Sequence, residues 1–178
     1  MLPIGLLPRS GPWEHVASTT LTAAAASITL PVLPVYRALW VEVYMINDAN
    51  DKSVNITLNG DTGTNYSRQH ITAESTNLSG ARQTGAANWG VTVGENENAS
   101  EEMQLDILIV KPSAAVKAQA LCQRNSQFAT ANAIGLSLLG FEWDNTTALI
   151  TSIALNAASN NFAIGTTVKV YGSRRMDA

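Results

Sequence analysis

Few residues in this chain have the types and spacing that catalysis requires. The sequence contains two histidines, His15 and His70, and a Ser-His-Asp arrangement would need one of them. His15 follows Trp13-Glu14 in a segment that alternates like a strand, and His70 lies in polar sequence without the residues that flank a nucleophile. Neither histidine has an HExxH or CxxC companion. We therefore expect packed or surface histidines, no catalytic residue, no metal and no cofactor.

Two pairs of carboxylates lie close together in the sequence, and paired carboxylates are what glycoside hydrolysis uses. They are Glu101 with Glu102, and Glu142 with Asp144. The second pair flanks Trp143, and an aromatic ring beside acids can stack on a sugar. The alternative is that Trp143 packs at a sheet or subunit interface. We favour the packing interpretation, so the chain is not expected to be an enzyme.

A polar segment after a short strand has the composition of a tight turn. In Ser53–Tyr66, apolar Val54, Ile56 and Leu58 alternate with polar residues, as in a half-buried strand. The residues that follow favour left-handed backbone or bond to their own backbone, and they predict a rigid structural turn: Asn59, Gly60, Asp61, Gly63 and Asn65. Oxygens at positions 59, 61 and 65 partly match calcium ligation, but the bidentate Glu is missing. We predict turn capping without an ion, with Tyr66 closing the turn against the sheet and alanine tolerated at Asp61.

Cys122 is the single cysteine, so the chain can form no intrachain disulfide and no multi-thiolate metal site. It falls on the apolar side of an alternating segment that begins at Val116. An inert core thiol is the expected state for such a residue.

Composition limits the classes of partner. The 178 residues suit one domain, and charged residues make up 14% where about a quarter is usual. A surface rich in Thr, Ser, Asn and Ala but poor in charge fits a protein packed in an assembly. The formal charge is −3 and no basic cluster exceeds Arg174-Arg175, so nucleic acid is not expected as a partner. The apolar segments are short and interrupted, and no secretory leader is evident, so we expect no membrane partner and folding in a cytoplasm.

The alternation of apolar and polar residues predicts an all-β domain. Turn signals recur every ten to fifteen residues or so, no amphipathic helix is evident, and this spacing is typical of a β-sandwich or a small barrel. We predict that 39–58 forms a hairpin and that 67–87 is a long loop with one short strand near 69–73. A last hairpin is expected from Phe162 to Gly172. The other expected strands lie at 13–22, 27–30, 89–93, 103–110, 116–123, 134–143 and 147–155.

The chain divides into three predicted parts: an arm at 1–12, the β-domain at 13–173 and a tail at 174–178. The arm is rich in Pro and Gly, yet it carries four aliphatic residues, which are Leu2, Ile4, Leu6 and Leu7. One interpretation is a frayed terminus. The other is an extended arm that binds a neighbouring subunit, because exposed aliphatic side chains on a solvated tail are unfavourable.

Several short motifs, taken in order, resemble a family of tailed-bacteriophage virion structural proteins. The segment Asn59–Tyr66, NGDTGTNY, is the most characteristic of them. The others are Trp13-Glu14, Ser18-Thr19-Thr20-Leu21, Ser27-Ile28-Thr29, Pro34 with Tyr36-Arg37 and Leu39, Trp143, Ile150-Thr151-Ser152-Ile153 with Leu155, Asn161-Phe162 with Gly165, and Val170-Tyr171-Gly172. Thr166-Thr167 differs from the pattern, which more often has Ser after the Gly, and the stretch 67–102 is unmatched.

This resemblance implies an antiparallel jelly-roll β-sandwich that forms a homotrimer on the virion and lacks catalytic residues. It implies a capsid decoration or cement protein that stabilises the phage head and contacts other virion proteins, such as the major capsid protein. The alternative is a tail-fibre or receptor-binding module that engages host-surface carbohydrate. Its aromatic candidates for facing a ligand are Trp40, Trp89 and Trp143.

Overall fold

The described part of the chain is built from β-strands. The computed structural model describes residues 13–32, 36–46, 53–74, 77–92, 102–128 and 133–174, and no helix occurs within these ranges. In chain order the strands are β1 (Trp13–Thr20), β2 (Ser27–Pro31), β3 (Tyr36–Ile46), β4 (Ser53–Leu58), β5 (Tyr66–Glu74), β6 (Asn77–Ala86), β7 (Trp89–Thr92), β8 (Glu102–Val110), β9 (Ala118–Phe128), β10 (Ala133–Trp143), β11 (Ser152–Ala157) and β12 (Thr167–Arg174).

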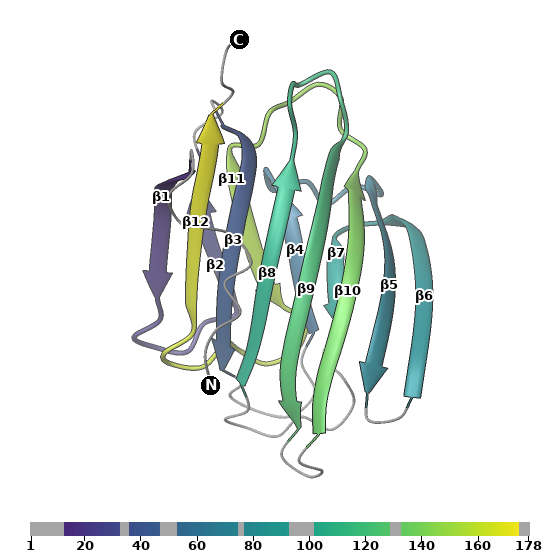
Figure 1. The fold of residues 1–178 in the computed structure, drawn as a ribbon. Coiled ribbons are helices and arrows are strands. Elements are labelled where there is room, and N and C mark those ends of the chain that lie inside the picture. Colours follow the sequence, from purple (N-terminus) through teal and green to yellow (C-terminus); the bar gives the residue numbers. More distant parts are fainter. Residues whose placement is uncertain are drawn as a thin grey trace.

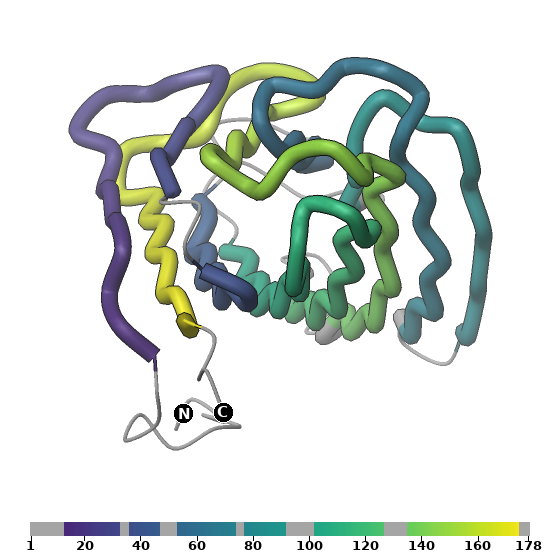
Figure 2. The backbone as a smooth tube through the Cα atoms, turned by 90° about the horizontal axis from the view of Figure 1, so that it is seen from above, coloured from purple at the N-terminus to yellow at the C-terminus, as the bar shows by residue number. Residues whose placement is uncertain are grey.

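The strands form two antiparallel sheets that pack as a sandwich. The large sheet has eight strands in the order β1-β12-β3-β8-β9-β10-β5-β6, and the small sheet has four in the order β2-β11-β4-β7. Figure 1 shows the large sheet in front of the small one. Figure 2, turned by 90°, shows the two sheets as facing layers, with β5 and β6 at one margin of the large sheet.

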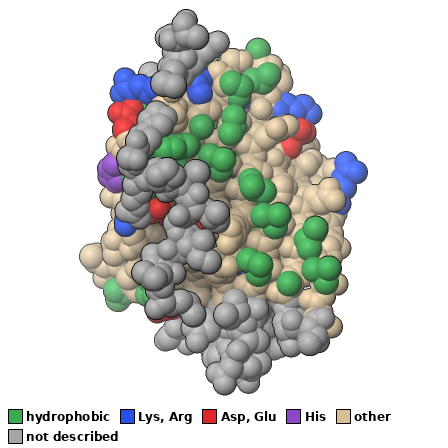
Figure 3. All heavy atoms as spheres, viewed as in Figure 1, with side chains coloured by type: hydrophobic (Ala, Val, Ile, Leu, Met, Phe, Trp, Pro, Cys, Tyr) green, Lys and Arg blue, Asp and Glu red, His purple; other side chains and the backbone are tan. Residues whose placement is uncertain are grey.

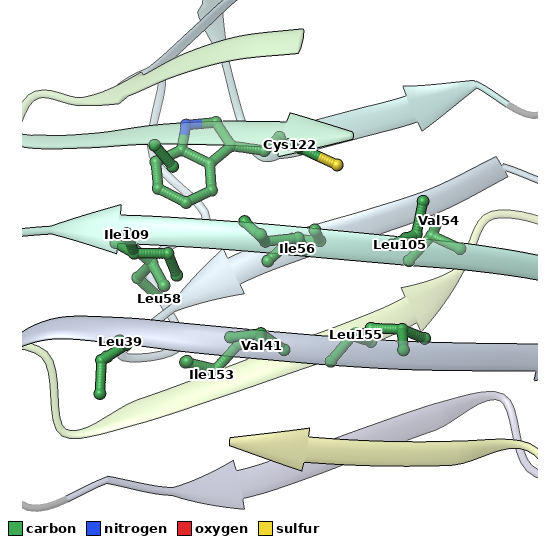
Figure 4. Close-up of a cluster of buried hydrophobic side chains, with 14 of the residues drawn as sticks. Leu39, Val41, Val54, Ile56, Leu58, Leu105, Ile109, Cys122, Ile153 and Leu155 are labelled. Carbon is green, nitrogen blue, oxygen red and sulfur yellow. The ribbon is translucent and has the colours of Figure 1, made fainter. Parts of the chain in front are cut away.

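The core fills the space between the sheets with the apolar face of each strand. In β3, Leu39, Val41, Val43 and Met45 are all buried, as the alternation predicts. Buried residues of β8, the neighbouring strand in the same sheet, and of β4 and β11 in the small sheet belong to the same core cluster (Figure 4). Burying each such aliphatic side chain stabilises the fold by about 1.5 to 3 kcal/mol. The sandwich interpretation of the sequence is therefore confirmed.

The predicted hairpin at 39–58 is wrong. β3 pairs with β12 and β8 in the large sheet, whereas β4 pairs with β11 and β7 in the small sheet. Packed sheets lie about 10 Å apart, a distance that the intervening residues can span. Alternation identified both strands, but it carries no information about which sheet a strand joins.

The predicted long loop at 67–87 is also wrong, although the short strand expected near 69–73 is present as part of β5. This segment forms two long strands, β5 and β6, which pair as an antiparallel hairpin. The residues of β6 are exposed on both faces up to Gly85. Because neither face is buried, the strand needs no alternation of apolar and polar residues, and the sequence pattern could not indicate it. A strand can persist here because β5 pairs with it along most of its length, with one irregularity between Tyr66 and Arg68.

The end of the chain also differs from expectation. Phe162 does not pair with 168–170 in a hairpin. It forms an isolated bridge with Ala25, and β12 inserts between β1 and β3 instead. β12 extends to Arg174, one residue into the predicted tail. The predicted arm at 1–12, including Leu2, Ile4, Leu6 and Leu7, lies outside the described residues.

Candidate functional site

The segment Asn59–Tyr66 forms the corner through which the chain passes from the small sheet to the large one. It follows β4 and leads directly into β5. Asn59 and Gly60 both have positive φ, 56° and 66°, and the Asp61 amide donates to the carbonyl of Leu58 at 3.0 Å. Two successive left-handed residues of this kind are characteristic of a type I′ turn, for which Asn-Gly is the preferred pair. The predicted structural turn at these residues is present.

The Asn59 side chain fastens this corner to the segment before β11. Its amide nitrogen donates to the Leu149 carbonyl at 2.7 Å. Its oxygen accepts from the amides of Thr151 at 2.7 Å and Ser152 at 3.2 Å. Asn59 therefore satisfies backbone groups that lie 90 or more positions away in the sequence.

The Asp61 carboxylate is bound on both oxygens by nitrogen donors. One oxygen accepts from the Gly63 amide at 2.8 Å, and the other accepts from the Asn65 side chain at 2.9 Å and the Trp143 indole at 2.7 Å. Burial alone would raise the pKa of Asp61, but hydrogen bonds from Trp143, Asn65 and Gly63 hold it below its usual value. Because N–H donors point at both oxygens, the carboxylate acts as a turn cap, in agreement with the turn-capping interpretation.

Tyr66 holds the same turn through its hydroxyl group and its buried ring. Its hydroxyl accepts from the Leu58 amide at 3.0 Å and lies 3.1 Å from the Asp61 carbonyl, to which it donates. Its ring is fully buried, edge-on to Trp89 at 5.9 Å and stacked on Trp143 at 6.4 Å between centroids. Burial raises the pKa of Tyr66 to about 12, opposed by the Leu58 bond and reinforced by the Asp61 charge. The predicted closure of the turn by Tyr66 therefore matches the structure.

A buried lysine that sequence reasoning missed lies beside this aromatic cluster. Lys111 is only 2% exposed, and its ammonium lies 5.3 Å from the centre of the Trp143 ring. The ammonium donates to the carbonyls of Val116 and Asn145, the latter at 2.6 Å. Burial lowers the pKa of Lys111. It ties the β8–β9 connection to the β10–β11 connection, and nothing in its sequence context distinguishes it from a surface lysine.

Two of the three tryptophans predicted to face a ligand cannot do so. Trp89 and Trp143 are fully buried, and their indole nitrogens donate inward to the Glu142 carbonyl at 2.8 Å and to Asp61. Rings of this size bury the most apolar area in the core, which explains their inward position. Trp40 lies on the outer face of β3, edge-on to Trp13 at 6.3 Å. Of the three candidates, only Trp40 is not fully buried, and its indole nitrogen is itself shielded from solvent.

The predicted acidic pair beside Trp143 serves a different purpose. Glu142 and Asp144 both contact the ammonium of Lys117, at 3.0 and 3.3 Å, on the exposed surface. A carboxylate pair that shares a cation is a surface ion-pair network. In the other pair, Glu102 begins β8 and Glu101 lies outside the described residues.

His15 lies on β1 at one margin of the large sheet, and His70 and Cys122 are separated by Leu139, with which both are paired across the sheet. The His15 ring packs edge-on to Tyr171 at 5.8 Å. His70 lies on β5, where burial and the charges of Arg68 and Arg124 lower its pKa. Cys122 is fully buried and burial strongly raises its pKa, so it is the inert core thiol that the sequence predicts. Within the described ranges, no three His, Cys, Asp or Glu side chains are grouped to hold a metal ion.

The outer face of the large sheet carries exposed aliphatic side chains that the sequence analysis did not single out. We call five of them the outer apolar band: Ile71, Leu78, Leu121, Leu136 and Leu138. Figure 3 shows green side chains crossing this face as a diagonal band, with most of the charged side chains near its margins. The sequence of β10 contains the pattern that could have revealed this surface, because Leu136 and Leu138 are exposed while Leu139 and Phe141 are buried. A strand that is apolar on both faces is expected to be covered on both.

Comparison of the chain with protein-family models, with curated proteins and with solved structures finds no match. Among the described residues, no helix has the length and apolar character needed to cross a membrane.

Proposed function

We propose that this chain is a non-enzymatic structural protein of a tailed-bacteriophage virion, where it decorates the capsid and stabilises the head through subunit contacts. The outer apolar band is the observation that carries this proposal. A contiguous group of exposed aliphatic side chains marks an interaction surface, which on this proposal other virion protein covers. The low charge of the chain, 14% of residues, favours broad contacts of the same kind.

The order of the strands supports the jelly-roll topology that the resemblance implies. In the small sheet, β2, β11, β4 and β7 stand where an eight-stranded jelly roll has its first, eighth, third and sixth strands. In the large sheet, β3, the β8–β9–β10 meander, β5 and β6 stand where it has its second, seventh, fourth and fifth. On this proposal the seventh strand is expanded into three, and β12 and β1 are added beside β3. Jelly rolls of this kind form many viral capsid proteins.

The motifs behind the resemblance contact one another, which supports treating them as one pattern. Asp61 of the NGDTGTNY segment accepts from Trp143. Tyr36 lies directly against Gly172, where an added Cβ would come within 2.2 Å of the ring. Residues that depend on each other in this way are expected to occur together.

The partners follow from this role. We propose that the chain binds copies of itself, as a homotrimer, and other virion proteins such as the major capsid protein, and that it resides in the virion after synthesis in the host cytoplasm. The apolar arm with Leu2, Ile4, Leu6 and Leu7 is proposed to reach a neighbouring subunit. Deleting residues 2–8 and measuring assembly tests the arm, and unchanged assembly would contradict it.

The stability of the particle tests the head role. Particles made without this chain are expected to release their genome at a lower temperature than complete particles, and added purified chain is expected to restore the difference. Identical heat-release curves would contradict a cement function. Binding to a glycan array that is lost in Trp40→Ala would favour the tail-fibre alternative, because Trp40 is the one aromatic candidate of the three that is not fully buried.

A further inference from the structure

We propose that a second copy of this chain binds over the outer apolar band, on the face formed by β9, β10, β5 and β6. This inference rests on the proposed assembly role, and it names the surface and the partner which that role uses.

Strand register makes the band continuous. Leu138 of β10 lies opposite Ile71 of β5, and Leu136 lies opposite Ala73, which in turn lies opposite Leu78 of β6. Leu121 of β9 lies opposite Gly140, one position further along the same face. Directly opposed side chains in a sheet are about 5 Å apart, so these residues form one surface and not scattered exposures.

The degree of exposure is unusual for such residues. The five side chains are between 46% and 75% exposed, with Leu78 the highest. Single exposed aliphatics are common on soluble proteins, but a contiguous group of them marks an interaction surface.

The edge strand β6 lies beyond the support of the small sheet, whereas its neighbour β5 still contacts β7 through Tyr66 and Arg68. All residues of β6 except Ala86 are exposed, including those that face the interior side, and β6 pairs only with β5 in the described sheet. β5 is held by β10 over its whole length, so β6 is the edge strand whose two faces lack cover. Arg82 is the charged residue of this edge strand, which contains no proline and no lysine. A partner over the outer face would cover the outward side chains of β6, including Leu78.

Charge favours a copy of the same chain as that partner. The residues between the band side chains are uncharged: Gln69, Ala73, Gly80, Gln123, Asn125 and Gly140. Charged groups lie at the margins, as with Arg82 on β6 and Glu142, which already contacts Lys117. Because the whole chain is poor in charge, a second copy can cover the band without burying unpaired ions.

The area of this face is large enough for a specific contact. The four strands have 9 to 11 residues each. At a rise of about 3.4 Å per residue and a strand spacing of about 4.8 Å, the face covers about 650 Å². Two partners would then bury about 1,300 Å² in total, which lies within the range for stable protein–protein interfaces.

The test is the oligomeric state of the full chain, measured by light scattering during size exclusion over a range of concentrations. We expect the wild type to self-associate and the double variant Leu136→Lys/Leu138→Lys to be monomeric, with an apparent dissociation constant at least about tenfold weaker. Ile164→Lys is the matched control, because Ile164 is 63% exposed but lies outside the band. The control is expected to associate like the wild type. Circular dichroism verifies that each variant is folded.

If the lysine variant does not fold, Leu136→Thr/Leu138→Thr removes apolar area while retaining strand propensity, and it carries the same expectation. A wild type that stays monomeric at the highest concentration would overturn the proposal. So would association that is equal in the band variant and the wild type, or association that appears only after residues 1–12 are deleted. Whether the chain occurs in particles is measured separately, so loss of this contact and loss of the virion role can be distinguished.

Discussion

Replacing Asp61 by alanine removes the acceptor for a buried indole donor. Trp143 is fully buried while Asp61 is half-buried, so loss of the carboxylate leaves the indole N–H unpaired unless a water molecule enters the gap. A buried donor left unpaired costs about 1 to 3 kcal/mol, and the two bonds to Gly63 and Asn65 add about 1 kcal/mol because those donors are near solvent. We therefore expect a loss of about 2 to 4 kcal/mol, where the sequence alone led us to expect tolerance.

This loss corresponds to a clear shift in melting temperature. For a chain of this size, each kcal/mol lowers Tm by about 2 to 4 °C, so Asp61→Ala should melt roughly 5 to 15 °C below the wild type. Urea unfolding followed by far-UV circular dichroism gives the free energy of unfolding without relying on tryptophan fluorescence.

A double-mutant cycle with Trp143→Phe isolates the bond itself. In the Trp143→Phe background there is no indole N–H that could be left without an acceptor. The loss in free energy of unfolding caused by Asp61→Ala should therefore be about 1 to 3 kcal/mol smaller than in the wild type. Equal costs in the two backgrounds, or a cost below about 0.5 kcal/mol in the wild type, would refute the reasoning. Calcium should leave the Tm of the wild type unchanged, and an increase that is absent in Asp61→Ala would establish an ion site instead.

Three further substitutions or conditions test the same framework. Gly172→Ala should lower stability by about 2 kcal/mol or more because its Cβ would overlap the Tyr36 ring, whereas Gly140→Ala, whose Cβ meets nothing closer than 4.0 Å, should change stability little; equal urea midpoints would contradict this. Gly60→Val should destabilise the turn strongly and Gly60→Asn mildly, since φ at this position is 66° and Asn tolerates left-handed backbone, and thermal melts of the two variants measure the difference. The pKa of Tyr66 is raised to about 12 in the folded state, so its contribution, about 2 to 3 kcal/mol, is present below pH 10 and lost as pH rises from 10 to 12. Tyr66→Phe should remove that part of the alkaline dependence in unfolding titrations, and an unchanged pH profile would count against it.

Local signals in the sequence predict most strands and the turn. The alternation at 39–45 and 103–109 survives in the structure because those strands bury one face in the core. Asn59 and Gly60 are recognisable because few other residues adopt the backbone that a type I′ turn requires.

Features that depend on distant partners could not be predicted in this way. The placement of β3 and β4 in different sheets depends on pairing with β12 and β11, which lie more than 90 residues away. β6 lacks an apolar pattern because neither of its faces is buried. The inward position of Trp89 and Trp143 and the burial of Lys111 likewise depend on which strands meet across the sandwich.

The copy number of this chain in purified virus particles tests the proposed role most directly. Particles are collected from bacteria in which the phage genome that encodes the chain is expressed. The amount of the chain in these particles is then measured by mass spectrometry relative to the major capsid protein. We predict hundreds of copies per particle, in a fixed ratio to the capsid subunits. A few copies per particle would indicate a tail location, and absence of the chain from particles would contradict the virion role.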